Sequence, residues 1–305
     1  MRIIFMGTPD FAVASLKALL DAGENVVAVV TTPDKPAGRG QKMHQSAVKV
    51  FAQEQNIPVL QPEKLRDKNF IDELKSYQAD LQVVVAFRML PEMVWNMPPL
   101  GTINVHASLL PQYRGAAPIN HAIINGEKES GVTTFLLQHE IDTGNILLAS
   151  KVAIAENDNA GILHDNLMNA GAKTLLATID GLKNNSLKAI PQEDIQVEEL
   201  KHAPKIFKED CLIDWNKTTD DVYNLIRGLS PYPAAFTHLN GKVLKIYEAT
   251  KIIEIHNELP GNFITDKKTY LKFATNDGYI DLKNIQIEGK KRINIDEFLR
   301  GYRFD

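Results

Sequence analysis

Short runs of branched apolar residues alternate with segments of helical spacing over the first half of the chain, and this alternation constrains the fold most. Runs typical of buried strands occupy residues 2–6, 25–32, 58–60, 81–87 and 101–107. Segments with apolar residues three and four positions apart separate them, as at residues 67–77. Strands joined by helices form right-handed crossovers, which give a parallel sheet covered on both faces. We therefore predict an α/β fold with a doubly wound, mostly parallel, Rossmann-like sheet.

The rhythm changes after about residue 130. Two strand-like runs flank a turn near residue 142, which predicts an antiparallel pair at the sheet edge, and a long amphipathic segment follows. Residues 189–206 are polar and show no sustained periodicity, so we expect a linker there. One helical segment and several short strands come next, which favours a small OB-like β-barrel. The expected organisation is a first domain over residues 1–188, the linker over 189–206 and a barrel domain over 207–305.

Composition excludes several classes of protein. Hydrophobic residues make up 44% and charged residues 24% of the 305, which is typical of an ordinary globular chain. No segment has the roughly 20 consecutive apolar residues of a membrane span. Cys211 is the single cysteine, so we expect no disulfide within the chain and a cytoplasmic location. The net charge of -4 argues against a general polyanion-binding surface but leaves local basic patches open. We expect a monomer.

The glycine turn after the first strand carries no nucleotide signature. Only Gly7 stands where a dinucleotide site has three spaced glycines, and the phosphate-binding pattern GxxxxGK[ST] does not occur. The eight histidines include no pair at the usual metal-ligand spacing, so we expect no metal. A loop that lines a cleft remains possible, because open α/β sheets bind ligands beyond the carboxyl ends of their strands.

Polar side chains gather where the strand at 101–107 ends. Alternation along the strand places Asn104, His106 and Ser108 on one side. Asp142 stands in the turn "DTG" at the antiparallel pair and is the carboxylate that we expect beside His106.

This combination of groups suits acyl-type transfer. A carboxylate fixes the tautomer of a neighbouring imidazole, and an amide donates to a developing oxyanion. No recognisable nucleophile accompanies them, which favours direct attack by a substrate amine on an activated one-carbon unit. Spacing alone also allows a core histidine satisfied by the backbone and an aspartate that only forms a turn.

The segment "NVHASLLPQYRGAAPI", followed by "DTG", resembles the signature of the folate-dependent formyltransferases. The stretches "RIIFMGTPDFA", "TTPDKPAGRGQK" and "IDWNKTTDDVYNLIRGLSPYP" extend the resemblance over essentially the whole chain, and they are most similar to members that act on charged initiator tRNA. The resemblance implies a transferase of translation initiation that moves the formyl group of 10-formyltetrahydrofolate to the methionine amino group of initiator tRNA. It also implies that Asn104, His106 and Asp142 are the catalytic residues.

The resemblance further assigns binding residues. Folate contacts fall on Ser108, Leu109, Leu110 and Pro111, and on Phe87, Arg88 and Met89 in "AFRMLP", a stretch one residue shorter than in many relatives. The basic loop that would enter the tRNA acceptor stem carries Lys35, Arg39 and Lys42. Without the resemblance, a solvated surface turn explains that loop equally well.

The barrel domain is a second expected tRNA contact. Candidate phosphate ligands are Lys267, Lys268, Lys290, Lys291 and Arg292. Tyr232 and Trp215 are predicted to be packing residues. Two alternatives stay open: a sugar-nucleotide formyltransferase, and a catalytically silent RNA-binding protein on the same scaffold.

Overall fold

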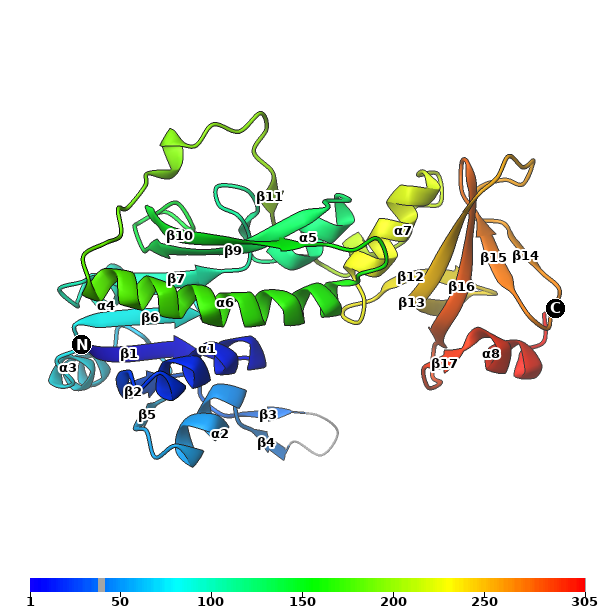
Figure 1. Ribbon diagram of the computed structural model, residues 1–305. Coiled ribbons are helices and arrows are strands. Elements are labelled where there is room, and N and C mark those ends of the chain that lie inside the picture. Colours follow the sequence, from blue (N-terminus) through cyan, green and yellow to red (C-terminus); the bar gives the residue numbers. More distant parts are fainter. Residues whose placement is uncertain (38–41, 305) are drawn as a thin grey trace. The chain divides into compact units, whose positions relative to one another are not determined.

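The computed structural model describes residues 1–37 and 42–304, and the chain forms two compact units (Figure 1). Unit 1 comprises Met1–Gly115, Ser130–Val152 and His164–Lys201, and unit 2 comprises Ala116–Glu129, Ala153–Leu163 and His202–Asp305. The units thus interleave along the chain. Residues 189–201 of the expected linker belong to unit 1 and contain the short helix η1 (Gln192–Asp194).

A seven-stranded sheet forms the centre of unit 1, in the order β10-β9-β7-β6-β1-β2-β5. Its strands are β1 (Arg2–Gly7), β2 (Asn25–Val30), β5 (Val59–Leu60), β6 (Leu81–Val85), β7 (Thr102–His106), β9 (Glu129–Leu136) and β10 (Ile146–Ala153). Strands β5, β2, β1, β6 and β7 run parallel, and β9 is antiparallel to β7. The predicted doubly wound, mostly parallel sheet is confirmed.

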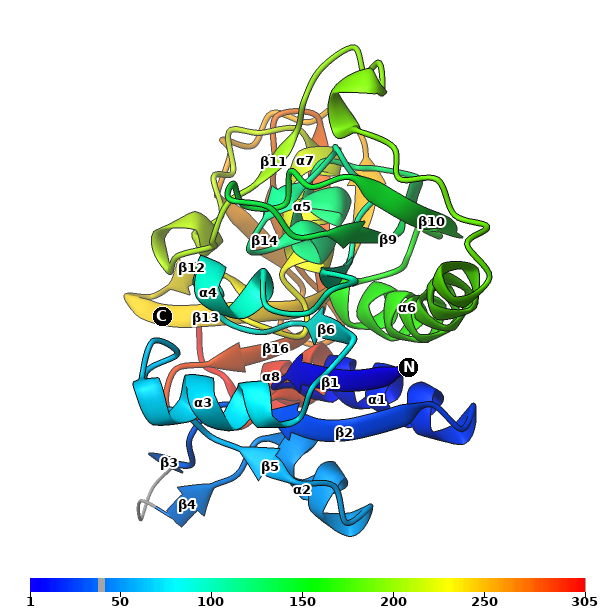
Figure 2. The same cartoon turned by 90° about the vertical axis from the view of Figure 1, so that its left-hand side faces the viewer.

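Helices cover both faces of this sheet (Figure 2). They are α1 (Asp10–Asp21), α2 (Ala47–Glu54), α3 (Lys68–Ser76), α4 (Glu92–Trp95) and α6 (Ala160–Lys183), the last mostly in unit 1. The apolar side chains of α3, such as Phe70 and Leu74, pack in one cluster with Ile4 from β1. From the other face, α6 approaches β7 so closely that a Cβ on Gly171 would lie 3.3 Å from Val105. Asn104 and His106, which alternate with Val105, therefore point away from α6.

Shorter elements complete unit 1 and lead into unit 2. Strands β3 (Lys35–Ala37) and β4 (Lys42–His44) pair antiparallel as an arm after β2. The remaining short elements are β8 (Arg114–Gly115), α5 (Pro118–Ile124), β11 (His202–Ala203) and η2 (Glu209–Cys211).

Unit 2 is built on an antiparallel sheet in the order β12-β13-β16-β15-β14, with β17 paired to β16. These strands are β12 (Ala235–Leu239), β13 (Lys242–Ile253), β14 (Phe263–Thr265), β15 (Leu271–Ala274), β16 (Gly278–Ile287) and β17 (Ile293–Asn294), accompanied by α7 (Thr219–Gly228) and α8 (Ile295–Gly301). The sheet confirms the expected small barrel-like domain, as an antiparallel half-barrel.

Of the two aromatic residues of unit 2 that were predicted to pack in the core, one is buried and the other is exposed. Trp215 is buried, stacks on Phe273 with ring centroids 4.7 Å apart, and donates to Thr237 at 2.9 Å, which confirms its packing role. Tyr232 is 82% exposed, so its predicted role as a core plug is wrong. The turn between Pro231 and Pro233 carries the ring outward instead of into the barrel core.

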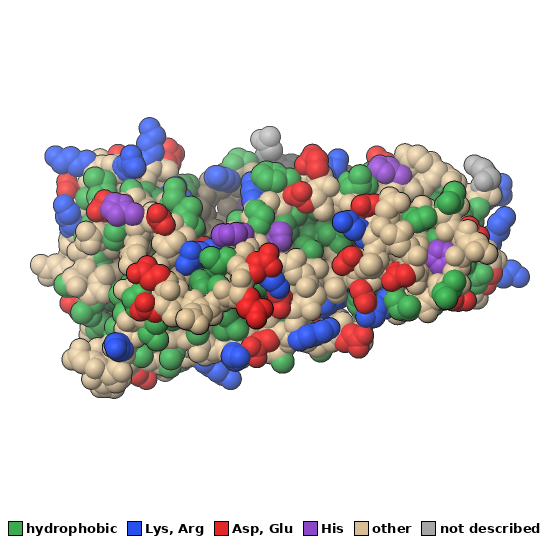
Figure 3. Space-filling model, turned by 90° about the horizontal axis from the view of Figure 1, so that it is seen from above, with side chains coloured by type: hydrophobic (Ala, Val, Ile, Leu, Met, Phe, Trp, Pro, Cys, Tyr) green, Lys and Arg blue, Asp and Glu red, His purple; other side chains and the backbone are tan. Residues whose placement is uncertain are grey.

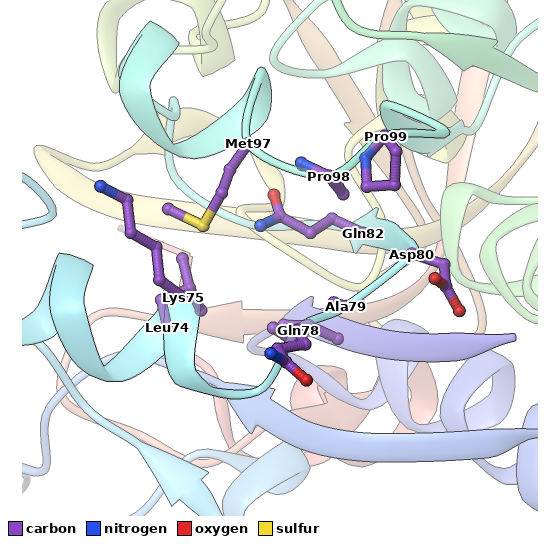
Figure 4. Close-up of a pocket in the computed structure, with 10 residues that line it drawn as sticks. Leu74, Lys75, Gln78, Ala79, Asp80, Gln82, Met97, Pro98 and Pro99 are labelled. Atoms are coloured by element: carbon purple, nitrogen blue, oxygen red, sulfur yellow. The ribbon is translucent and has the colours of Figure 1, made fainter.

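A cavity of about 440 Å³ opens at the amino ends of the strands of unit 1 (Figure 4). Its lining includes Leu74, Met97 and Pro98, together with Gln82 of β6, whose amide oxygen accepts from Thr102. The constellation predicted from the sequence lies at the opposite, carboxyl ends of these strands. No described helix is long and apolar enough to span a membrane.

A carboxylate holds the first turn of α7 in unit 2. Asp277 accepts hydrogen bonds from the backbone N–H of Thr219 at 2.7 Å and from its hydroxyl at 2.8 Å. These bonds, the backbone bond first, lower the pKa of Asp277 below the ordinary value for aspartate.

Replacing Asp277 with Asn should therefore destabilise unit 2 in a pH-dependent way. A folded-state pKa below the unfolded one contributes stability above the unfolded pKa and loses it as pH falls through the folded pKa. We expect a loss of roughly 0.5 kcal/mol at pH 7, the usual scale for a charge at a helix N-terminus. The loss should shrink as pH drops below about 4. Thermal unfolding of both proteins from pH 7 to pH 3 tests this, and a difference that does not change with pH contradicts it.

Candidate active site

His106 is the last residue of β7 and is fixed by one of its two ring nitrogens. Its Nε2 lies 3.0 Å from the carbonyl oxygen of Tyr113, and its ring meets Phe135 edge to face. A carbonyl oxygen can only accept, so Nε2 carries a proton and donates. The neutral ring then keeps its lone pair on Nδ1, which becomes a donor when the ring is protonated. His106 can act as acid or base only through Nδ1.

Asp142 lies in the loop between β9 and β10, opposite that nitrogen. One carboxylate oxygen, Oδ2, accepts from the backbone N–H of Gly115 at 3.0 Å. The same oxygen is 3.9 Å from Nδ1 of His106, and the two side chains are only 11% and 9% exposed. This separation is beyond a direct hydrogen bond. The two groups face each other closely enough to interact electrostatically, and each can still bond to a third group.

Asn104 stands two residues before His106 on the same side of β7. Phe135 of β9 lies opposite Asn104 in the pairing of β7 with β9, which places this aromatic ring beside both polar residues. Asn104 is half-buried, and within the described part of the chain its side-chain amide has no hydrogen-bond partner. The structure thus brings an uncommitted amide, an imidazole and a carboxylate to one edge of the sheet.

The predicted folate segment that follows His106 is braced internally. The buried hydroxyl of Ser108 donates to the carbonyl of Gln112 at 2.7 Å, and its own carbonyl accepts from Thr133 at 2.7 Å. Thr133 also accepts from the N–H of Leu110 at 3.1 Å. Leu110 packs against Phe135 in a small apolar cluster. The Ser108 hydroxyl is committed to the loop, so its segment can contact a ligand mainly through backbone and apolar surface.

The second predicted folate segment follows β6 and turns sharply. Ala86 has a left-handed backbone, with φ 47°. Arg88 directs its guanidinium to the carbonyl oxygens of Pro62 and Glu63, the latter at 3.0 Å, and therefore anchors the loop. Phe87 is half-buried and Met89 is 76% exposed.

The three predicted tRNA-binding cations belong to the arm after β2. Lys35 is exposed in β3. Arg39 lies outside the described residues, and for Lys42 only the backbone is described. Asp34 precedes the arm and pairs with Lys49 at 2.6 Å. Hydrogen bonds from Lys49 and then Gln61 lower the pKa of Asp34, which stays ionised and committed away from the arm.

Sequence reasoning missed the residues that hold the site together. Tyr113 and Gly115 lie inside the quoted signature, in "QYRG", but their roles come from backbone groups, which residue type does not indicate. Gln192 donates to the carbonyls of Asp142 and Gly144 from a segment expected to be a linker. Nothing in its local pattern distinguishes it, because its partners lie about 50 residues away in sequence.

In unit 2, a cavity of about 420 Å³ combines basic and aromatic side chains. Its lining includes Lys205, Phe207, Lys208, Tyr232 and Lys245. The rings of Phe207 and Tyr232 are exposed, and the ammonium of Lys205 lies 5.3 Å from the Phe207 ring centroid. The arrangement has the components of a site for a phosphate and a stacked base.

Family models match nearly the whole chain. A model described as formyl transferase matches residues 1–179, and one described as formyl transferase, C-terminal domain, matches residues 205–303. Among curated relatives, the methionyl-tRNA formyltransferase of Phocaeicola vulgatus is 57% identical over 311 residues, which cover 99% of this chain and 96% of the relative. The enzyme of the same name from Flavobacterium johnsoniae is 51% identical over 308 residues, covering 100% and 97%.

Solved structures share the fold at lower identity. The sugar 3N-formyl transferase WlaRD superposes with a TM-score of 0.68 at 23% identity, covering 95% of this chain and 99% of that one. HypX from Aquifex aeolicus, in complex with tetrahydrofolic acid, superposes with a TM-score of 0.66 at 20% identity, covering 100% and 48%.

Gly144 offers a test of how tightly the Asp142 loop is packed. A Cβ at Gly144 would lie 1.6 Å from the carbonyl oxygen of Leu136, so Gly144→Ala must displace the loop. We expect a loss of about 2 kcal/mol in unfolding free energy, typical of strained backbone and overpacking. Gly301→Ala is the matched control, because its Cβ would meet open space. Equal unfolding midpoints for the two variants in a thermal melt would contradict this packing.

Proposed function

The chain belongs to the formyl transferase family, and we propose that it transfers the formyl group of 10-formyltetrahydrofolate to the amino group of methionyl initiator tRNA. The chain is 50–57% identical to full-length curated relatives named for this reaction. The observation that carries the proposal is the placement of Asn104, His106 and Asp142 at the carboxyl edge of the sheet, with Nδ1 of His106 facing the Asp142 carboxylate at 3.9 Å.

The proposed mechanism needs no covalent enzyme intermediate. The amine of methionine attacks the formyl carbon, and the carbonyl oxygen gains negative charge as the new C–N bond forms. The free amide N–H of Asn104 donates to that oxygen, and protonated Nδ1 of His106 donates or transfers a proton to it. Asp142 stabilises the imidazolium and accepts the proton that the attacking nitrogen loses. Collapse of the intermediate restores the C=O bond and breaks the old C–N bond. Any proton that His106 gave to the oxygen returns to Nδ1, and the proton held by Asp142 is transferred to the leaving folate nitrogen.

The two loops beside the site suit the folate co-substrate. Within the described chain, the backbone groups of residues 87–90 make no hydrogen bonds to other backbone groups, so they are available to a planar heterocycle. Phe87 and Met89 add apolar contact surface. Arg88 anchors the loop by donating to the carbonyl oxygen of Glu63. The half-buried Leu109 offers apolar surface after His106, supported from below by the buried Leu110, and we propose this segment as the other side of the folate slot.

Support for a tRNA acceptor comes from local clusters of positive charge rather than from the net charge of the chain. On the face that Figure 3 presents, basic and acidic side chains are interspersed, in line with the net charge of -4. The segment that contains β3 and β4 includes Lys35, Arg39 and Lys42, and the neighbouring Asp34 pairs with Lys49 of α2. The Lys205–Tyr232 cavity of unit 2 is a second proposed tRNA contact, alongside the lysines of the barrel.

Substitution of the catalytic residues should slow transfer strongly without unfolding the protein. We expect His106→Ala and Asn104→Ala each to lower kcat/KM by about 100- to 1,000-fold, the usual loss for an oxyanion donor or acid–base group. Asp142→Asn should cost a similar factor. The assay follows labelled formyl from 10-formyltetrahydrofolate to charged initiator tRNA, with circular dichroism as the folding control.

The same assay separates the acceptor classes. Free methionine and an amino-sugar nucleotide serve as competing acceptors. Formylation of the small amines but not of the tRNA would overturn the acceptor assignment. A His106→Ala protein that keeps full activity would overturn the catalytic one and favour an RNA-binding role.

The basic arm should contribute to tRNA affinity through phosphate contacts. Removing its charges together (Lys35→Ala, Arg39→Ala and Lys42→Ala) should raise KM for tRNA about tenfold or more and leave KM for the folate donor unchanged. Each lost phosphate contact lowers the log–log salt slope by roughly 0.7 to 0.9.

A control with the same loss of charge tests whether position matters. Lys64, Arg66 and Lys68 are exposed in the same unit, and their triple alanine variant removes two lysines and one arginine as well. Equal effects of the two triple variants on KM and on the salt slope would show that the arm has no special role.

A further inference from the structure

The side chain of Gln192 links the two segments that hold His106 and Asp142. It is 4% exposed and belongs to η1, in the stretch whose sequence pattern indicates only a linker. We propose that Gln192 is a positioning residue for formyl transfer, which acts by keeping the Asp142 carboxylate opposite His106. This assignment rests on the proposed function of the site.

Gln192 uses all of its hydrogen-bonding capacity. Nε2 donates to the carbonyl oxygens of Asp142 at 2.9 Å and Gly144 at 2.8 Å. Oε1 accepts from Nε of Arg114 at 3.0 Å and from a terminal guanidinium nitrogen at 2.6 Å. An amide has two N–H donors and an oxygen with two lone pairs, so every position is filled. The orientation of the amide is therefore fixed, because a flip would oppose two carbonyls with an oxygen.

The donor side of Gln192 fixes the backbone that presents the carboxylate. Asp142 has φ 57°, in the left-handed region that non-glycine residues adopt only when their surroundings hold them. The neighbouring chain contributes as well, since Ile146 and Ile190 exchange two backbone hydrogen bonds of 2.8 Å. Among the described side chains, only that of Gln192 bonds to the carbonyls of Asp142 and Gly144.

The acceptor side of Gln192 fixes the opposite segment. Arg114 lies between Tyr113, whose carbonyl accepts from Nε2 of His106, and Gly115, whose N–H donates to the Asp142 carboxylate. Holding the Arg114 side chain therefore restrains both backbone groups. The Gln192 amide therefore connects the loop that carries the Asp142 carboxylate to the segment that bonds to the His106 ring.

The chemistry of the contact predicts how substitutions behave. Gln192→Ala removes both sides of the link. Gln192→Glu is close in shape and still accepts from Arg114, but it cannot donate to the two carbonyls and places negative charge against them. We expect both variants to lower kcat about 10- to 100-fold, since a shift of about 1 Å at a reacting group costs on that order. KM for donor and tRNA should change less than about threefold.

Gln196→Ala is the matched control for these variants. It is the same residue type in the same segment, but it is exposed and has no side-chain hydrogen bond within the described chain. Its kcat should equal that of the wild type.

A double-mutant cycle distinguishes positioning from simple stabilisation. If Gln192 acts mainly through Asp142, then adding Gln192→Ala to Asp142→Ala should lower kcat no further than about threefold, because the carboxylate is already gone and His106 keeps its own bond to Tyr113. Gln192→Ala should lower the melting temperature both in the wild type and in the Asp142→Ala variant. A full 10-fold or greater loss of kcat in the Asp142→Ala background would overturn the proposal.

A measurement independent of activity completes the test. The Gly115 N–H bonds to the Asp142 carboxylate, so its amide hydrogen exchange reports whether that carboxylate stays in place. Exchange at Gly115 should accelerate at least tenfold in Gln192→Ala and remain unchanged in Gln196→Ala. Unchanged exchange in Gln192→Ala overturns the positioning role, even if kcat falls. If the wild type does not formylate tRNA, the proposed function fails, while this exchange still decides whether Gln192 holds Asp142.

Discussion

The approach of His106 Nδ1 to the Asp142 carboxylate is the interaction on which the rest of the account depends. Each group is fixed by a backbone partner: the carbonyl of Tyr113 holds the other nitrogen of the imidazole, and the N–H of Gly115 holds the carboxylate oxygen that faces His106. Both partners lie on one short segment, so a single loop sets the position of two reactive groups from different parts of the sheet. The 3.9 Å gap leaves both free to bond with a substrate, which a direct hydrogen bond between them would discourage.

The sheet explains why this approach occurs at all. Parallel strands bring their carboxyl ends to one edge, where His106 ends β7. Strand β9 is antiparallel to β7 and runs away from that edge, and the loop after β9 brings Asp142 back toward His106. Burial on both faces makes β6 and β7 rigid, so the loops that follow them start from fixed positions. The cavity of about 440 Å³ at the amino ends of the strands has no comparable set of reactive groups in its lining.

Local patterns in the sequence were sufficient to predict the strands and the sheet. They placed Asn104 and His106 on one side of a strand, but the resemblance was needed to assign these residues and Asp142 to one site. Residues 3–6 and 83–85 are apolar throughout, which is what burial on both faces requires. Features that depend on distant contacts could not be predicted. The direction of Arg88, for example, is set by carbonyls 25 and 26 residues away. The interleaving of the two units is likewise a long-range property, because it depends on which segments pack together.

A crystal structure of the protein with a formyl donor whose formyl group cannot be transferred tests the central claim most directly. The account predicts that the formyl oxygen lies within roughly 3.2 Å of the Asn104 amide nitrogen and of His106 Nδ1, with the Asp142 carboxylate facing the side from which an amine attacks. A bound donor whose formyl oxygen is out of hydrogen-bond range of both Asn104 and His106 would contradict it.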